Sequence, residues 1–198
     1  MPRDSPESVG RFYTPSQVFK ALDAIASKRG YTQLRVSGNE PTLGRDHLLS
    51  LLDLVEEAGR YTFILETNGI LIGHDASYAR DLAKYRCIHV RVSLKGASRE
   101  EFTRLTGAIP EAFDLQLKAL ENLLKEGVPC HPAVMLSFSS KDSLKALTSK
   151  LRSIDPTLVE ELEEEYVFMY PHVAERLKKA GIQPKIAYSP NRIPEELI

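Results

Sequence analysis

The stretch LRVSGNEPTLGRDHLLSLLDLVEEAG, residues 34–59, contains one complete strand–loop–helix unit. Its first four residues predict a short strand. From about Asp46 the apolar residues recur at helical spacing, and Gly59 ends the predicted helix. A strand joined to a helix by a short loop is the repeating unit of parallel α/β folds.

Strand-like and helical stretches alternate along the rest of the chain. Thr14 and Gln17 form a capping box around Pro15, which predicts a helix that ends at Gly30. Strands are predicted at residues 34–37, 61–66, 87–94, 132–138 and 166–170, with 185–188 as a further candidate. Further helices are predicted from about Asp46, Asp75, Ser98, Pro110, Asp142, Pro156 and His172. The acidic run 160–165 is expected to be a solvated helix face.

This alternation predicts an α/β fold with a parallel sheet and right-handed crossovers. We expect a single domain over residues 1–198, a partial (β/α)6-type half-barrel similar to part of a TIM barrel, with helices outside. Its core would span about 14–180, and a tail would follow at 182–198. The first predicted element is a helix, so the first strand of the half-barrel is missing. The strand at 34–37 is then an edge, open to packing by the N-terminal dozen residues or to dimerisation.

The bulk composition limits the classes of partner. The formal net charge is −1, so there is no excess of Lys and Arg for nucleic acid or an anionic membrane. The sequence shows neither a long apolar segment nor a signal peptide pattern, and we expect a soluble, cytoplasmic protein. Cys87 and Cys130 each lie in an apolar run, too far apart for a CxxC pair, and are expected to be buried, reduced thiols.

Small polar residues follow each predicted strand. Ligands of parallel α/β folds bind at the carboxyl ends of the strands, so these residues should share one rim. They are Gly38, Asn39, Glu40, Pro41, Glu66, Thr67, Asn68, Ser93, Lys95, Ser137, Ser139 and His172. Together they suit a polar, zwitterionic ligand.

Taken singly, each of these residues has an ordinary structural explanation. Glu40 could be a helix-entry carboxylate, and Asn68 with Gly69 is a common turn dipeptide. Lys95 could lie in a solvated loop, and His172 could simply start a helix.

Three of these segments, GNEPTL at 38–43, ETNG at 66–69 and SLKG at 93–96, resemble the radical S-adenosylmethionine (SAM) superfamily. Within it they are most similar to the pyruvate formate-lyase activating enzyme type and its archaeal relatives. The segments stand in the order of that family and at the ends of three successive predicted strands, and the resemblance covers roughly residues 14–180.

The resemblance implies a SAM site at the first two segments. Gly38, Asn39, Glu40 and Pro41 correspond to the segment that surrounds the SAM ammonium group, where backbone must approach closely. Asn39 replaces a glycine, so any positive φ there must be adopted by asparagine, which tolerates it. Thr67 and Asn68 correspond to residues near the methionine moiety or the ribose.

The resemblance is less complete at the later strands. Ser93 and Lys95 correspond to a polar group near SAM and substrate, but Ser93 replaces an aspartate, which removes a charge. Ser137 and Ser139 correspond to a partner for the SAM carboxylate. Lys95 and His172 are the candidates for a catalytic or substrate-side role.

The resemblance also implies a [4Fe-4S] cluster that cleaves SAM reductively to a 5'-deoxyadenosyl radical, held by three thiolates of a CxxxCxxC loop. This sequence contains no such loop. In the family the loop follows the first strand, so one N-terminal truncation would explain both gaps. We therefore expect a cluster only in a full-length form, and an unknown protein or small molecule as substrate.

Two other interpretations remain open. The chain could be a non-catalytic barrel remnant that binds SAM or another ligand. It could also be an unrelated barrel lyase that forms a Schiff base on Lys95, with Glu66 or His172 as acid or base. The lyase interpretation expects Lys95 in an apolar pocket that favours the neutral amine.

Overall fold

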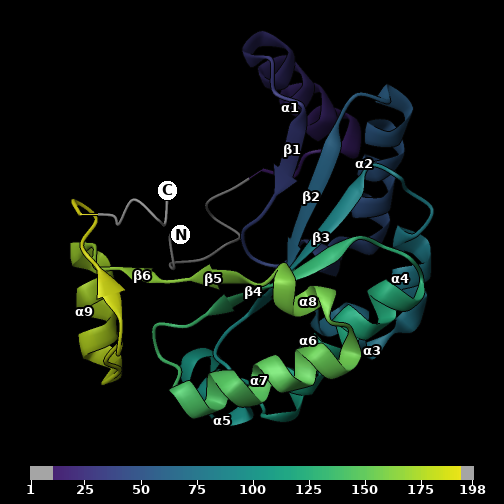
Figure 1. The fold of residues 1–198 in the computed structure, drawn as a ribbon. Helices are drawn as coiled ribbons and strands as arrows, with labels where there is room; N and C mark the ends of the chain where they lie inside the picture. The colour runs from purple at the N-terminus through teal and green to yellow at the C-terminus, as the bar shows by residue number, and fades with distance from the viewer. Residues whose placement is uncertain (1–10, 193–198) are drawn as a thin grey trace.

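The computed structural model describes residues 11–192, and its centre is a five-stranded parallel sheet in the order β1-β2-β3-β4-β5 (Figure 1). The strands are β1 (Gln33–Val36), β2 (Thr62–Thr67), β3 (Ile88–Leu94), β4 (Cys130–Met135) and β5 (Glu163–Glu165). Sequence order and spatial order coincide, so each crossover moves the chain to the next position in the same direction. Among the described residues β1 pairs only with β2, which confirms the expected edge strand.

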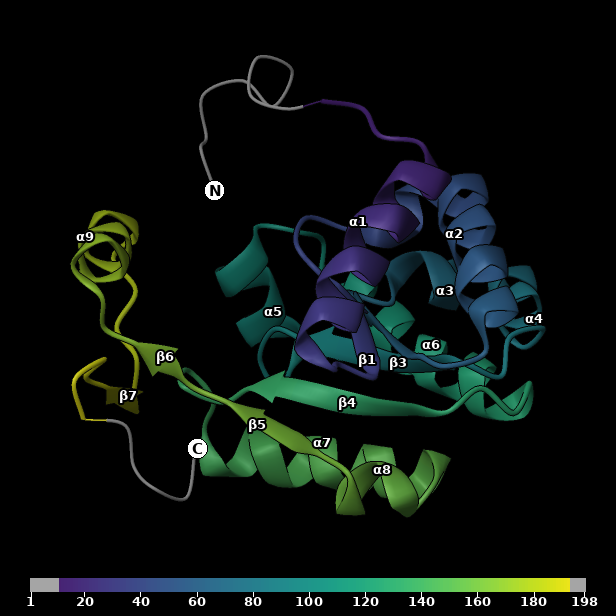
Figure 2. The ribbon, with the colours of Figure 1, turned by 90° about the horizontal axis from the view of Figure 1, so that it is seen from above.

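Helices connect the strands and cover one face of the sheet (Figures 1 and 2). They are α1 (Pro15–Arg29), the 3-10 helix η2 (Pro41–Gly44), α2 (Arg45–Ala58), α3 (Ile70–His74), α4 (Ala76–Leu82), α5 (Arg99–Thr106), α6 (Glu111–Lys125), α7 (Lys141–Ile154) and α8 (Thr157–Glu160). One further helix, α9 (Pro171–Ala180), lies apart from this face (Figures 1 and 2). The strand side chains under these helices are fully buried, among them Phe63, Leu65, Val90, Val92 and Val134. Burial of this apolar surface is the main favourable term for folding.

Local signals fixed several of these elements as expected. Thr14 and Gln17 make both hydrogen bonds of the capping box at α1, and Gly30 ends that helix in the left-handed conformation. Gly59 ends α2 in the same way. The α/β half-barrel with outer helices is therefore confirmed, although the short helix α3 after Gly69 was not predicted.

The acidic run departs from the prediction of a solvated helix face. Glu163–Glu165 forms β5, which pairs in parallel with β4. Glu163 and Glu165 lie two residues apart on this strand and both contact Arg91. The prediction is wrong over these residues because the cation that compensates the acids lies on β3, 72 positions away along the chain from Glu163.

The segment 166–170 was predicted as the next strand of the main sheet, and this is also wrong. Only β6 (Val167–Phe168) is extended, and it pairs with β7 (Ala187–Tyr188) in a separate two-stranded sheet. These two strands and α9 form a small lobe beyond the end of β5 (Figures 1 and 2). Residues 193–198 of the predicted tail and most of the N-terminal dozen lie outside the described residues.

Within residues 11–192 no helix is both long and apolar enough to cross a membrane. The face of the sheet opposite the helices is polar, and charged side chains from β1, β2, β3 and β5 meet on it.

The backbones of α3 and α6 approach very closely at Gly73. A Cβ atom on Gly73 would lie 1.9 Å from the carbonyl oxygen of Leu115, so one of the two helices would have to move. We predict that Gly73→Ala lowers the free energy of unfolding by at least about 1–3 kcal/mol, as overpacking does. Urea denaturation measures this difference.

Gly44→Ala is the matched control. A Cβ there would lie 3.7 Å from the nearest atom, Cβ of His47, which is an ordinary contact. Equal stability of the two variants would contradict the proposed close packing of α3 on α6.

Candidate functional site

The carboxyl ends of the first three strands surround a pocket of about 260 Å³, which we call the strand-end pocket. Its lining residues are Gly38, Asn39, Glu40, Glu66, Thr67, Asn68, Arg91, Ser93, Lys95 and Glu165. The structure thus brings together most of the residues predicted to share a rim. Arg91 and Glu165 are additional members.

The loop after β1 presents its backbone to the pocket in a left-handed conformation. Gly38 has φ 90° and Asn39 has φ 50°, and Asn39 is the one non-glycine residue with positive φ among the described residues. Asparagine tolerates this conformation better than most residues, as the sequence predicted for this position. Two successive residues of this kind turn the chain sharply without placing a bulky side chain at the pocket.

Glu40 both lines the pocket and holds its walls together. Its Oε1 accepts hydrogen bonds from the hydroxyls of Thr42 and Thr67, each at 2.6 Å, and its Oε2 accepts one from the backbone N–H of Asn68 at 2.7 Å. It also caps η2 through the Thr42 amide, so the helix-entry explanation describes part of its role. Glu40 therefore ties the loop after β1 to the end of β2.

Lys95 lies in a polar environment at the end of β3. Its Nζ is 2.7 Å from the hydroxyl of Ser93 and 2.9 Å from Oε2 of Glu165. The lyase interpretation expects an apolar surrounding for this amine, whereas here a hydroxyl and a carboxylate hold it. This arrangement does not favour the lyase interpretation.

Arg91 is the buried cation of the open sheet face. Its guanidinium donates to both carboxylate oxygens of Glu163 at 2.7 Å and to Oε1 of Glu165 at 2.8 Å. Its Nη1 also lies 3.4 Å from Oε1 of Glu66, which pairs in addition with Arg35. Sequence reasoning did not select Arg91, because its position in mid-strand gives no hint of three acidic partners.

The carboxylates around Arg91 are stabilised in the ionised form. The hydrogen bonds from Arg91 lower the pKa of Glu163 to about 2, against the opposing effect of burial. Burial by itself raises the pKa of Glu165, but Lys95 and Arg91 together bring it below its usual value.

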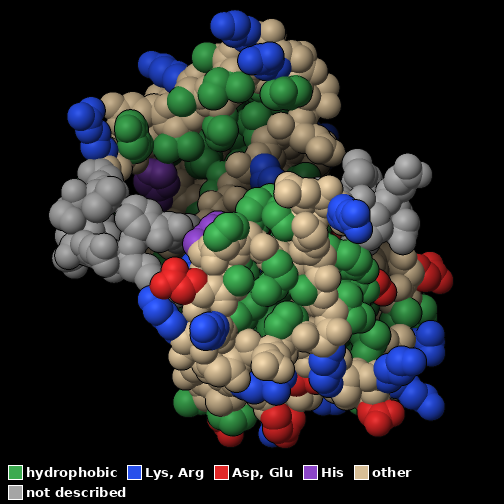
Figure 3. All heavy atoms as spheres, turned by 90° about the vertical axis from the view of Figure 1, so that its left-hand side faces the viewer, with side chains coloured by type: hydrophobic (Ala, Val, Ile, Leu, Met, Phe, Trp, Pro, Cys, Tyr) green, Lys and Arg blue, Asp and Glu red, His purple; other side chains and the backbone are tan. Residues whose placement is uncertain are grey.

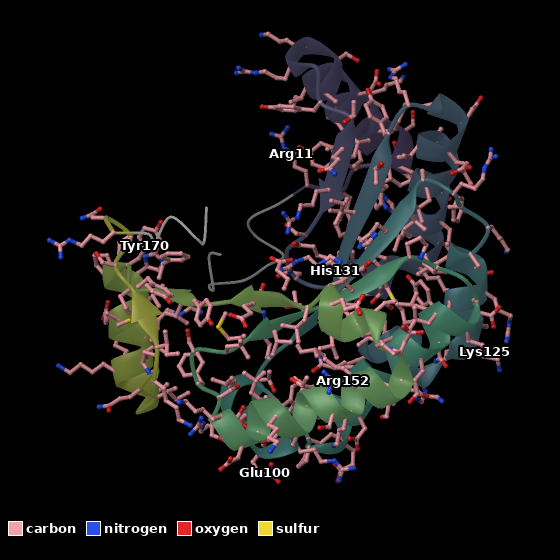
Figure 4. The ribbon with its side chains drawn as sticks, viewed as in Figure 1. Arg11, Glu100, Lys125, His131, Arg152 and Tyr170 are labelled. Atoms are coloured by element: carbon pink, nitrogen blue, oxygen red, sulfur yellow. The ribbon has the colours of Figure 1, made fainter. Side chains whose placement is uncertain are left out.

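Two histidines extend this network toward the other end of the strands. Nε2 of His89 lies 2.7 Å from Nδ1 of His131, and Nε2 of His131 lies 3.2 Å from Oε2 of Glu163. Burial, together with His131, lowers the pKa of His89. Figure 4 shows His131 near the centre of the molecule, on the side where the sheet is open.

Four of the residues predicted from the sequence do not line the strand-end pocket: Pro41, Ser137, Ser139 and His172. Ser137 is buried and its hydroxyl accepts the backbone N–H of Val167 at 2.8 Å, so it holds β6. The Ser139 hydroxyl donates to Glu101 at 2.6 Å. His172 is exposed on α9 and stacks on Tyr170, which Figure 4 shows far from His131. Pro41 starts η2 and does not line the pocket.

Gln116 is a buried positioning residue that the sequence did not reveal. Its Nε2 donates to the carbonyl oxygens of Asn68 at 2.8 Å and Ser93 at 3.0 Å, and so joins the ends of β2 and β3 from α6. Its residue type is the available signal, since Gln116 and Asn122 are amides among the otherwise apolar buried residues of α6.

The cysteines lie at the opposite ends of the strands from the pocket. Cys87 directly precedes β3 and Cys130 begins β4, and burial raises the pKa of each thiol to about 12. Thiols of this kind are poor metal ligands, because the thiolate is the ligating form. Within residues 11–192 no group of three or more His, Cys, Asp or Glu side chains is arranged to hold a metal ion.

Comparison with known proteins places the chain in one family. The family model described as Radical SAM superfamily matches residues 2–151. A "Probable GTP 3',8-cyclase" of Saccharolobus islandicus is 31% identical over 104 residues, which are 52% of this chain and 32% of that protein. The chain thus spans about a third of the length of the curated relative.

Solved structures share the fold at low identity. The crystal structure of Streptococcus suis SuiB bound to precursor peptide SuiA superposes with a TM-score of 0.62 at 18% identity. The aligned part is 91% of this chain and 43% of the SuiB chain. SuiB bound to S-adenosylmethionine has a TM-score of 0.60 at 18% identity, over 90% of this chain and 44% of its own.

The lowered pKa of Glu163 predicts an acid-dependent loss of stability. A carboxyl group with a lowered pKa in the folded state stabilises the fold above its unfolded pKa, near 4.5, and loses this contribution as the pH falls toward about 2. We predict that Glu163→Gln makes the free energy of unfolding less dependent on pH between about 4.5 and 2.5. Urea denaturation at a series of pH values measures it.

Glu164→Gln is the control, because the Glu164 carboxylate accepts a hydrogen bond from the Tyr166 hydroxyl and not from Arg91. If Glu163→Gln and Glu164→Gln changed the pH dependence equally, the specific role of the Arg91 pair would be contradicted.

Proposed function

The chain belongs to the radical SAM superfamily, and on that premise we propose that its strand-end pocket binds the amino-acid part of S-adenosylmethionine. The observation that carries this proposal is the convergence of three strand ends on one polar pocket next to a left-handed backbone turn. The family match supplies the identity of the ligand.

The charges of the pocket suit a zwitterion. An ammonium group needs several acceptors in a tight shell, and the Glu66 carboxylate lines the pocket, where it also pairs with Arg35 and Arg91. A carboxylate needs donors, and the Lys95 ammonium and the Asn68 side-chain amide line the same pocket. Glu40 is already bound to Thr42, Thr67 and Asn68, so its role toward the ligand is to hold the walls in place.

The described residues do not fit the [4Fe-4S] cluster of this family. A cluster needs cysteine thiolates, but burial raises the pKa of Cys87 and Cys130 to about 12, and both lie at the far ends of the strands. We therefore assign to these residues the binding and orientation of SAM. Reductive cleavage of SAM to a 5'-deoxyadenosyl radical is proposed only for a form of the protein that also supplies the thiolates of the cluster.

The curated relatives carry the name Probable GTP 3',8-cyclase, and the aligned part is about a third of their length. The narrower similarity to the pyruvate formate-lyase activating enzyme type stays a prediction from the sequence. The aligned region supports a shared SAM-binding part more directly than a shared substrate.

A non-catalytic SAM-binding protein is the second candidate, and the poor fit of the described cysteines to a cluster favours it. Anaerobic reconstitution of the full-length natural protein with iron and sulfide, followed by SAM and a reductant, separates the two. Formation of 5'-deoxyadenosine supports the enzyme. A fully loaded cluster that yields none supports the binding protein.

We predict weak, saturable binding of SAM to the isolated chain, with a dissociation constant on the order of 1 mM, or about −4 kcal/mol. Chelation of SAM to an iron atom is missing, and it contributes much of the affinity in this family. Amide chemical shifts recorded by NMR during a SAM titration measure the constant and locate the site. Tight binding, or shifts confined to another surface, would contradict the proposal.

Gly38→Val should remove this binding, because valine at φ 90° is strained and Gly38 lines the pocket. Gly107→Val is the matched control. Gly107 has φ 75° and open space around its Cβ position, so it carries a similar backbone penalty away from the pocket. If both variants lost SAM binding equally, the effect would come from general destabilisation.

A further inference from the structure

A second pocket of about 290 Å³ lies where the small lobe meets the main body, and we call it the α9 pocket. Its walls come from α5, the end of β4, β6 and α9. Its lining includes Lys95, Leu105, Phe138, Val173, Arg176 and Leu177.

The lining of the α9 pocket combines apolar surface with positive charge. Its charged side chains are Lys95 and Arg176, and no carboxylate is among the lining residues that the structure describes. The strand-end pocket, by contrast, contains three acids. The two pockets therefore differ in the ligand chemistry that they favour.

The apolar face of α9 is incompletely packed. No residue of α9 is buried, and Val173 and Leu177 remain partly exposed toward the pocket. Figure 3 shows hydrophobic side chains gathered on the part of the molecule nearest the viewer, with Lys and Arg side chains along its edge. A helix face of this kind can gain free energy when an apolar group covers it.

The lobe is attached firmly enough to define the pocket. The Ser137 hydroxyl accepts the amide of Val167 at 2.8 Å, and the Ser137 carbonyl accepts the amides of Lys185 at 2.6 Å and Ile186 at 3.2 Å. One buried residue at the end of β4 thus anchors both chain segments that carry the lobe.

Lys95 lines both pockets, so they meet at this residue. Its ammonium is already held by Glu165 and Ser93. Arg176 is exposed and makes no salt bridge within residues 11–192, so its guanidinium is the cation available to an incoming ligand.

We propose that the α9 pocket binds a small organic anion with a compact apolar body, whose anionic group pairs with Arg176. This inference rests on the proposed function in one respect: if SAM occupies the strand-end pocket, a ligand of the α9 pocket lies next to it, in the place of the substrate. The pocket is at the lower end of the size range for small-molecule sites, about 300–1,000 Å³, so the ligand is smaller than most drugs.

Two fluorescent probes with the same ring system test the charge requirement. The anion is 8-anilinonaphthalene-1-sulfonate, and the neutral probe is N-phenyl-1-naphthylamine. Arg176→Gln should weaken the sulfonate about fivefold, the upper range for an exposed ion pair, and leave the neutral probe within about twofold. Lys179→Gln on the same helix is the control and should change neither, because Lys179 pairs with Glu175.

Filling the pocket tests its location. Val173→Trp should weaken both probes at least about tenfold by occupying the apolar space. Leu105→Trp does the same from α5 if the first variant does not fold. The midpoint temperature of thermal unfolding of each variant must match that of the parent chain, because these probes also bind partly unfolded proteins.

The proposal is overturned if neither probe binds the parent chain, or if a correctly folded Val173→Trp or Leu105→Trp variant binds both probes with unchanged affinity. It is also overturned if Arg176→Gln and Lys179→Gln change the affinity for the sulfonate equally. A SAM titration of the same variants separates this outcome from the proposed function. Probe binding as expected without SAM binding removes the SAM assignment alone, and SAM binding without probe binding removes the α9 pocket alone.

Discussion

The ion pairs of Arg91 are the interaction on which the open side of the sheet depends. A guanidinium that is 8% exposed must be paired, because an isolated buried charge costs several kcal/mol or more. Arg91 meets this need with Glu163 and Glu165 on β5 and with Glu66 on β2. It therefore connects two strands that are not neighbours in the sheet. Glu163 and Glu165 on β5 meet this requirement, although acidic residues are otherwise uncommon in strands.

The same network determines how the two pockets meet. Glu165 accepts a hydrogen bond from Arg91 on one carboxylate oxygen and one from Lys95 on the other. The position of the Lys95 side chain at the end of β3 therefore depends on β5. Glu40 and Gln116 fix the neighbouring strand ends, one from the loop after β1 and one from α6. The result is a polar rim joined by hydrogen bonds, and α9, which has no buried residue, lies beside it. This contrast suits a site that holds one ligand in a fixed pose and admits another from a more adaptable side.

The sequence predicted the strand–helix units because caps, glycine stops and apolar periodicity are local. Thr14, Gly30 and Gly59 behave as their local sequences indicate. It also predicted that Asn39 would tolerate a positive φ. It failed at Glu163–Glu165, because the acids of β5 are stabilised by a cation on β3 that no local pattern reveals. It also assigned the segment after β5 to the main sheet, whereas β6 pairs with β7. Ser137 was selected for the ligand but anchors the lobe, and Gln116 was overlooked because a buried amide in a helix has no distinct pattern.

The central claim is that the strand-end pocket is where SAM binds. The most direct measurement is the set of intermolecular nuclear Overhauser effects between SAM labelled with ¹³C at its methyl group and the assigned amide protons of the chain. The account predicts contacts to Gly38, Asn39, Asn68 and Ser93. Contacts to Val173 and Leu177 of the α9 pocket instead, or none at ligand saturation, would contradict it.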